Sequence, residues 1–293
     1  MTGTGTKKFW LRIAGAILLI FLIAGVILGV LTALDLTDTV LGRYTPSMFF
    51  AGFMGILFAG ALLWYVRSLG GMRVSDLGFH WQSRHTGFIA LIVSLTLLMA
   101  WVYMLVLNQF GVRSLVMNMP HWTAITAGII GSLSILHEEI LNRGYIMTML
   151  GRRYSVGAAL LISSFIFMLI HIPTRGLSYL AITWFGMGLV YGYLYLKSGS
   201  LWVAFAFHAV HNFAADLLMY TNNEIGLFQF DPALGAAGHL PFRFILALTA
   251  IGLVYLWYGR KTPFLAPAPE LVRSWSGLAE DRPAPAQGQV DPA

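Results

Sequence analysis

Eight apolar segments constrain this chain more than any other feature of its sequence. A helix needs roughly 20 mostly apolar residues to cross the hydrocarbon core of a bilayer. In lipid, only helices and closed barrels satisfy every backbone hydrogen bond. The segments therefore predict an all-α, polytopic membrane protein of about eight transmembrane helices, at about residues 10–33, 48–67, 87–107, 122–150, 156–171, 177–196, 200–220 and 242–258.

The composition agrees with a membrane protein and excludes several other classes. Only 10% of the residues are charged and 58% are hydrophobic, whereas a soluble domain is about 25% charged. The chain has no cysteine, which excludes disulfides, thiolate catalysis and cysteine-based zinc sites. The net charge of +6 does not indicate a nucleic-acid partner, because the basic residues are scattered around the ends of the spans.

The basic residues instead predict the orientation in the bilayer. With a cytoplasmic N-terminus, 13 of the 18 Lys and Arg residues fall in inside segments and 4 in outside segments, and Arg143 is buried in a span. Loops on the cytoplasmic side carry an excess of Lys and Arg, so we expect both termini to be cytoplasmic. The first apolar segment is long enough to span, and we expect it to be retained rather than cleaved as a signal peptide.

Two regions differ in composition. We expect residues 1–261 to form the transmembrane helical domain. Residues 262–293 are rich in Pro and Ala, a composition typical of a flexible tail, which would be cytoplasmic in this orientation. The longest connection between spans, residues 68–86, is expected at the membrane interface.

Three charged residues lie together in the fourth span, as Glu138, Glu139 and Arg143. A charge at the bilayer centre costs several kcal/mol, so intramembrane charges mark functional sites. Glu139 and Arg143 are four residues apart, on one helix face, and can pair. Glu138 points about 100° away and is left for chemistry. The alternative is a buried ion pair that only fixes helix packing.

Later spans carry further polar residues at the same spacing. His171 follows Phe167 by four residues, and Asn212 follows His208 by four. Measured along the helices, Glu138, His171, His208 and Asn212 fall in a band roughly 10 Å thick near the middle of the bilayer. The alternatives are a histidine that caps a helix end, a phenylalanine that only packs, and polar groups that bond neighbouring helices.

Other features favour structural roles. His137, His211 and Asp216 could support the polar residues, with Asp216 orienting Asn212, but the sequence favours packing roles for them. Gly25-x-x-x-Gly29 and Gly188-x-x-x-Gly192 predict close helix contacts. Four aromatic residues near one end of spans six and seven are most simply an interfacial belt, namely Tyr191, Tyr193, Tyr195 and Trp202.

Together, the three polar motifs resemble those of the CAAX-protease and bacteriocin-processing (CPBP) family of intramembrane proteases, which includes the Abi and lysostaphin-resistance-A-like proteins. The family motifs EExxxR, FxxxH and HxxxN occur here in order, as Glu138-Glu139…Arg143, Phe167…His171 and His208…Asn212. The resemblance covers about residues 120–220, the expected catalytic core. It implies a helical bundle like that of the type II CAAX prenyl endopeptidases, in a prokaryotic plasma membrane.

The resemblance also implies a role for each residue. Glu138 would activate water, and His171 would hold that water. His208 and Asn212 would form the oxyanion hole. Glu139, Arg143 and Phe167 would shape the site and neutralise its charge.

A metal is the open point in this interpretation. Carboxylate and imidazole groups are zinc ligands, so Glu138, His171 and His208 could hold zinc or another divalent metal. The sequence does not decide between this site and water activation by Glu138 alone.

We therefore expect an intramembrane endopeptidase that hydrolyses a peptide bond of a membrane-associated protein or peptide. One rival is a non-proteolytic immunity or scaffold protein that uses the same fold. A second rival is an ion-coupled transporter, with Glu138 and Glu139 as proton carriers. The lack of an internal repeat and of obviously broken helices argues against the transporter.

Overall fold

The fold is described from a computed structural model that carries the whole chain. It describes residues 3–111, 113–115, 122–177, 180–219, 228–230 and 240–259. The predicted tail, 262–293, lies outside these residues, so the division of the chain at residue 261 remains a prediction.

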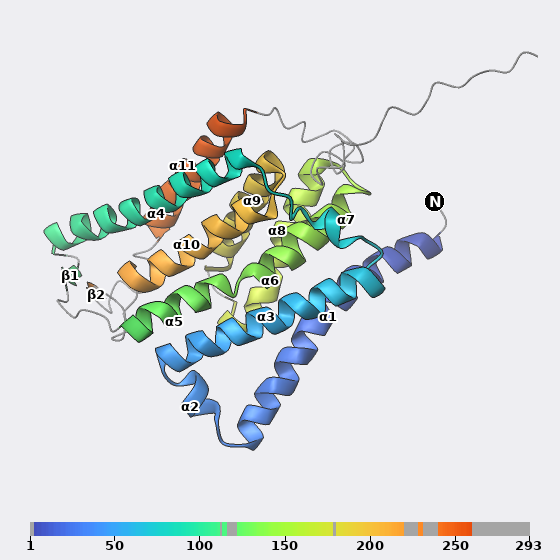
Figure 1. Ribbon diagram of the computed structural model, residues 1–293, viewed down its shortest axis with the longest axis horizontal. Coiled ribbons are helices and arrows are strands. Elements are labelled where there is room, and N and C mark those ends of the chain that lie inside the picture. Colours follow the sequence, from blue (N-terminus) through green and yellow to red (C-terminus); the bar gives the residue numbers. More distant parts are fainter. Residues whose placement is uncertain are drawn as a thin grey trace, which may run out of the picture.

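A bundle of long helices makes up the molecule (Figure 1). A helix forms at each of the eight predicted positions, which confirms the all-α class. Seven of them are single helices, namely α1 (Gly3–Ala33), α3 (Tyr44–Ser68), α4 (Ser83–Gln109), α8 (Val156–Arg175), α9 (Leu180–Ser198), α10 (Leu201–Met219) and α11 (Leu240–Tyr258).

Short elements connect the long helices. A five-residue helix, α2 (Thr37–Leu41), joins α1 to α3, and a 3-10 turn, η1 (Val74–Leu77), lies between α3 and α4. Two three-residue strands, β1 (Arg113–Leu115) and β2 (Phe228–Phe230), pair antiparallel and join two distant loops. They are too short to alter the fold class.

Six segments of the described residues are long and apolar enough to cross a membrane. They are α1, α3, α4, the fourth span, α8 and α11. The helices α9 and α10 are not among them; α9 carries three tyrosines and Lys197, and α10 carries two histidines, Asn212 and Asp216. Many large apolar side chains on the outside of the bundle are exposed, as expected where helices meet lipid. The chain is an integral membrane protein.

The fourth span is not a continuous helix, contrary to our expectation of unbroken helices. It consists of α5 (Trp122–Leu133), a turn at residues 134–135, α6 (Leu136–Glu139), the π-helix η2 (Ile140–Met147) and α7 (Thr148–Gly151). At the turn, the hydroxyl of Ser134 donates to the carbonyl oxygen of Gly131, 2.5 Å away. Such a local bond competes with helical hydrogen bonding. Single turns of π-helix are frequent at functional sites.

Glycines allow α3 and α9 to approach their partners. A Cβ on Gly55 of α3 would lie 2.6 Å from the backbone of Ser134, so α3 packs directly on the turn. A Cβ on Gly188 would lie 3.1 Å from Ser164 of α8, which confirms the predicted close contact at that motif. The prediction is wrong for Gly25-x-x-x-Gly29, since nothing in the described residues lies within 4 Å of a Cβ at either glycine.

Two apolar cores hold the bundle together. The first joins α1, α3, η2, α7 and α8, and includes Leu62, Ile140, Leu141 and Leu150. The second joins α4, α8, α9, α10 and α11. Glu139 directly precedes Ile140 of the first core, and His208 directly follows Phe207 of the second. The polar residues of the motifs therefore lie where the two cores meet.

Candidate active site

The two adjacent glutamates have different environments. Glu139 is fully buried, and its Oε1 accepts from Nη1 of Arg143 at 3.2 Å and contacts Nδ1 of His208 at 2.8 Å. Glu138 is partly accessible, with 22% of its side chain exposed. The predicted pairing of Glu139 with Arg143 is confirmed, and Glu138 is left facing another group.

Arg143 is enclosed on all sides by the site. It is only 2% exposed, and its Nη2 donates to the carbonyl oxygen of Gly188 at 3.2 Å. Its guanidinium lies 4.5 Å from the ring centre of Phe167 and 5.1 Å from that of Tyr191. A buried charge needs a partner and hydrogen bonds to be tolerated, and Arg143 has both, together with two aromatic faces.

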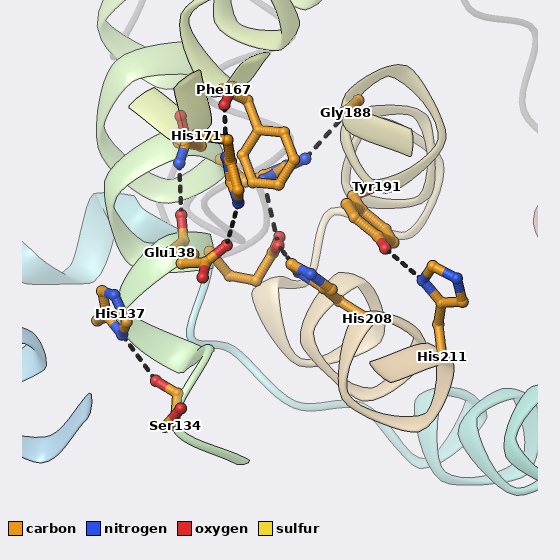
Figure 2. A network of polar contacts seen from close by, with 12 residues as sticks. Ser134, His137, Glu138, Phe167, His171, Gly188, Tyr191, His208 and His211 are labelled. Atoms are coloured by element: carbon orange, nitrogen blue, oxygen red, sulfur yellow. Dashed lines mark hydrogen bonds and ion pairs between the residues drawn. The ribbon is translucent and has the colours of Figure 1, made fainter. Parts of the chain in front are cut away.

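The protonation of His208 follows from its partner. Oε1 of Glu139 already accepts from Arg143, and an oxygen of a carboxylate paired with a guanidinium can only accept. Nδ1 of His208 therefore carries a proton and donates to Glu139 (Figure 2). The second ring nitrogen, Nε2, is the atom left for a substrate.

The same argument applies to His171, which faces Glu138. Its Nδ1 lies 2.7 Å from the carbonyl oxygen of Phe167, and since a carbonyl only accepts, Nδ1 is protonated. Its Nε2 points at Oε2 of Glu138, 3.7 Å away (Figure 2). That distance is too long for a direct hydrogen bond. Among the described residues, the buried Oε2 of Glu138 has no hydrogen-bond partner.

Phe167 lies between the two histidines. Its ring centre is 4.5 Å from that of His171 and 6.0 Å from that of His208. The structure thus brings six of the seven predicted residues into one cluster, formed by Glu138, Glu139, Arg143, Phe167, His171 and His208.

Asn212, the seventh, lies one turn beyond His208 on α10 and is half-buried. Among the described residues, the side chain of Asn212 makes no polar contact. Asp216 does not visibly orient it; instead, Asp216 accepts from the hydroxyl of Tyr44 at 3.2 Å. His137 packs on Phe58 and bonds the carbonyl oxygen of Ser134 at 2.7 Å.

Sequence reasoning assigned Tyr191 to an aromatic belt, and this interpretation is wrong. Tyr191 is 1% exposed and its ring stacks on that of His208, with centres 4.1 Å apart and planes 18° apart. Its hydroxyl bonds Nδ1 of His211 at 2.8 Å (Figure 2). Tyr195 is also fully buried. Only the close glycine contact at Gly188, three residues before Tyr191, could have indicated which side of α9 faces the site.

The predicted metal ligands do not form a metal site as they lie. Among the described residues, no group of three or more His, Asp or Glu side chains could hold a metal ion. Nδ1 of His208 is bonded to Glu139, and Nε2 of His171 lies 3.7 Å from Oε2 of Glu138. The arrangement is instead one of two imidazoles, each facing a different carboxylate.

The comparison with known families confirms the resemblance that the motifs predicted. Residues 118–214 match the family model described as type II CAAX prenyl endopeptidase Rce1-like. The matched segment is about a third of the chain and contains all three motifs. The matched family is one of proteases. No curated protein and no solved structure matches the chain.

Proposed function

We propose that this protein is an intramembrane endopeptidase that hydrolyses a peptide bond of a membrane-associated protein or peptide. The observation that carries the proposal is the difference between the two glutamates. Glu139 is bonded to a guanidinium and an imidazole. Glu138 has 22% of its side chain exposed and no such bond among the described residues, whereas the side chain of Glu139 is fully buried. A general base must reach its water, and of the two glutamates Glu138 is the one with an accessible side chain.

In this proposal a water molecule bonds both Oε2 of Glu138 and Nε2 of His171. Polar groups separated by more than about 3.5 Å are commonly bridged in this way. Glu138 removes a proton while the water oxygen attacks the carbonyl carbon of the substrate. The carbon–nitrogen bond then breaks, and the departing nitrogen takes the proton from Glu138. The chain's own residues thus supply both the base and the acid.

His208 and Asn212 would bind the oxyanion of the tetrahedral intermediate. Because Nδ1 of His208 donates to Glu139, its Nε2 donates to an oxyanion only when the ring is an imidazolium, which the Glu139 carboxylate stabilises. The amide of Asn212 donates without a change in protonation. Donors held in a water-poor site stabilise such an anion strongly. The proposed mechanism uses no metal, and chelation tests whether cleavage depends on one.

The name of the matched family suggests a substrate class, a protein or peptide with a prenylated CAAX terminus. We propose the broader class, a membrane-associated protein or peptide, and include the prenylated form as a probe. The excess of basic residues in the predicted inside segments supports cytoplasmic termini, and a prokaryotic plasma membrane remains part of the proposal.

Terminal proteomics of membranes tests the function and names the substrate. Cells that express the wild type are compared with cells that express Glu138→Ala, and new protein termini are mapped. We expect termini that occur in the wild type and disappear in Glu138→Ala. Asp38→Ala, which removes an exposed carboxylate in α2, is the matched control and should retain them. Identical termini in the wild type and in Glu138→Ala would contradict the proposal.

The rival functions predict other results. A scaffold or immunity protein would keep its phenotype in both Glu138→Ala and His208→Ala. The broken fourth span removes one argument against a transporter, but the family match supports a protease. Proton-dependent uptake by proteoliposomes, abolished by Glu138→Gln, would support the transporter.

A further inference from the structure

One helix that carries none of the three motifs contacts the site through a single face. Trp184, Gly188 and Tyr191 of α9 are separated by four and three residues, a spacing that places them one above another on a helix. Each touches a different part of the site: Trp184 contacts His171, Gly188 accepts from Arg143, and Tyr191 contacts His208.

The contact of Tyr191 with His208 is nearly parallel. The ring centres are 4.1 Å apart, and both side chains are at least 95% buried. The hydrogen bond to Glu139 holds only the Nδ1 atom of the imidazole. A single bond of this kind still permits the ring to tilt. The tyrosine face removes this freedom, so it determines where Nε2 points.

Tyr191 is itself held by a second contact. Its hydroxyl bonds Nδ1 of His211 at 2.8 Å, and His211 is on α10, three residues after His208. The tyrosine is therefore fixed at its far end by the same helix that carries the imidazole on which it stacks. Its other neighbours, Arg143 and Phe167, also belong to the site.

His171 has an equivalent support two helical turns away. Its ring stacks on that of Trp184, with centres 5.7 Å apart and planes 27° apart. The hydrogen bond to the carbonyl oxygen of Phe167 again holds only Nδ1. Each imidazole thus has a hydrogen bond at Nδ1 and an aromatic face from α9, and the ring of Phe167 lies near both.

We infer that α9 supplies the positioning residues of this site: Tyr191, anchored by His211, orients Nε2 of His208, and Trp184 orients Nε2 of His171. The inference rests on the proposed function for its catalytic consequence. Reacting groups must be held closely, because a displacement of about 1 Å can cost about 100-fold in rate. Tyr191 and Trp184 touch no reacting atom and act through the imidazoles.

Kinetics of Tyr191 variants test the catalytic consequence. The probe is a quenched-fluorescent peptide that spans a cleavage site mapped by terminal proteomics, with rates normalised to folded protein. We expect Tyr191→Leu to lower kcat about 100-fold and to change KM less than about threefold. Tyr191→Phe keeps the ring and should recover most of the rate. Tyr193→Leu, on the same helix but beside Lys197, is the control and should match the wild type.

Histidine ring NMR tests the positioning without any substrate. In protein labelled with nitrogen-15 at histidine, the wild type should show His208 and His171 protonated at Nδ1, each with a ring-current shift from its aromatic partner. Tyr191→Leu should change the ring-current shift of His208 and leave that of His171, and Trp184→Leu should do the reverse, while both rings stay protonated at Nδ1.

The kinetics and the histidine NMR distinguish a failure of the proposed function from a failure of the positioning inference. If Glu138→Ala cleaves the probe as well as the wild type, the proposed function fails while the NMR result still judges the positioning. If Glu138→Ala is inactive but Tyr191→Leu keeps the kcat of the wild type and leaves the signal of His208 unchanged, the positioning inference is overturned.

Discussion

Removal of the buried arginine gives the sharpest test of how the site is held together. Arg143→Met keeps a side chain of similar length but leaves the fully buried Glu139 with His208 as its remaining partner among the described residues. Loss of one partner from a buried ion pair typically costs about 3–5 kcal/mol. An ordinary hydrogen bond between membrane helices contributes about 0.6 kcal/mol. The cost of breaking a buried ion pair and the cost of losing an ordinary hydrogen bond differ enough for a measurement to show which of them applies to Arg143.

The assay is the free energy of unfolding in mixed micelles, for Arg143→Met, Glu139→Gln and the double variant. We expect each single change to cost about 3–5 kcal/mol. The double variant should cost clearly less than their sum, because it leaves neither charge uncompensated.

Arg153→Met is the matched control. Arg153 also contacts aromatic rings and donates a hydrogen bond, to Thr6, but it is partly exposed. Arg153→Met should lower the free energy of unfolding by less than about 1 kcal/mol. A cost below about 1 kcal/mol for Arg143→Met, or additive costs in the double variant, would refute the view that charge pairing holds the site.

Three further outcomes are expected. Chelation with 1,10-phenanthroline should leave peptide cleavage unchanged, and loss of cleavage that zinc restores would identify a metal enzyme. Gly55→Ala should lower the free energy of unfolding by about 1–3 kcal/mol, because its Cβ would meet the Ser134 backbone; Gly29→Ala, with open space around it, should not, as thermal melts would show. Asn212→Ala should lower kcat about 100-fold at an unchanged melting temperature, and an unchanged kcat would remove Asn212 from the oxyanion hole.

The sequence alone determined the helices and the pairing within one helix. Lipid permits only internally bonded backbone, so apolar runs had to become helical, and helices formed at all eight predicted positions, although the fourth is broken. The four-residue spacing of Glu139 and Arg143 required a shared face, and the pair forms. These relations are local, and a periodic helix carries them without reference to the rest of the chain.

The broken fourth span depended on packing instead. The hydropathy of the fourth span does not reveal the turn at Ser134. That turn has room because Gly55, on another helix, has no side chain. The sequence contained both residues but not their contact. The same reason explains why Gly188 packs closely while Gly29, in an identical motif, does not.

The tertiary structure alone decided the rotation of each helix, and with it the face that each neighbour contacts. Tyr191 and Tyr193 are both tyrosines on α9, yet only Tyr191 stacks on His208. Helical periodicity relates residues on one helix, whereas the rotation of that helix depends on how all side chains fill the two apolar cores. The sequence therefore specified the chemical groups of the candidate site, and the packing of α9 against α8 and α10 determined how their imidazoles are held.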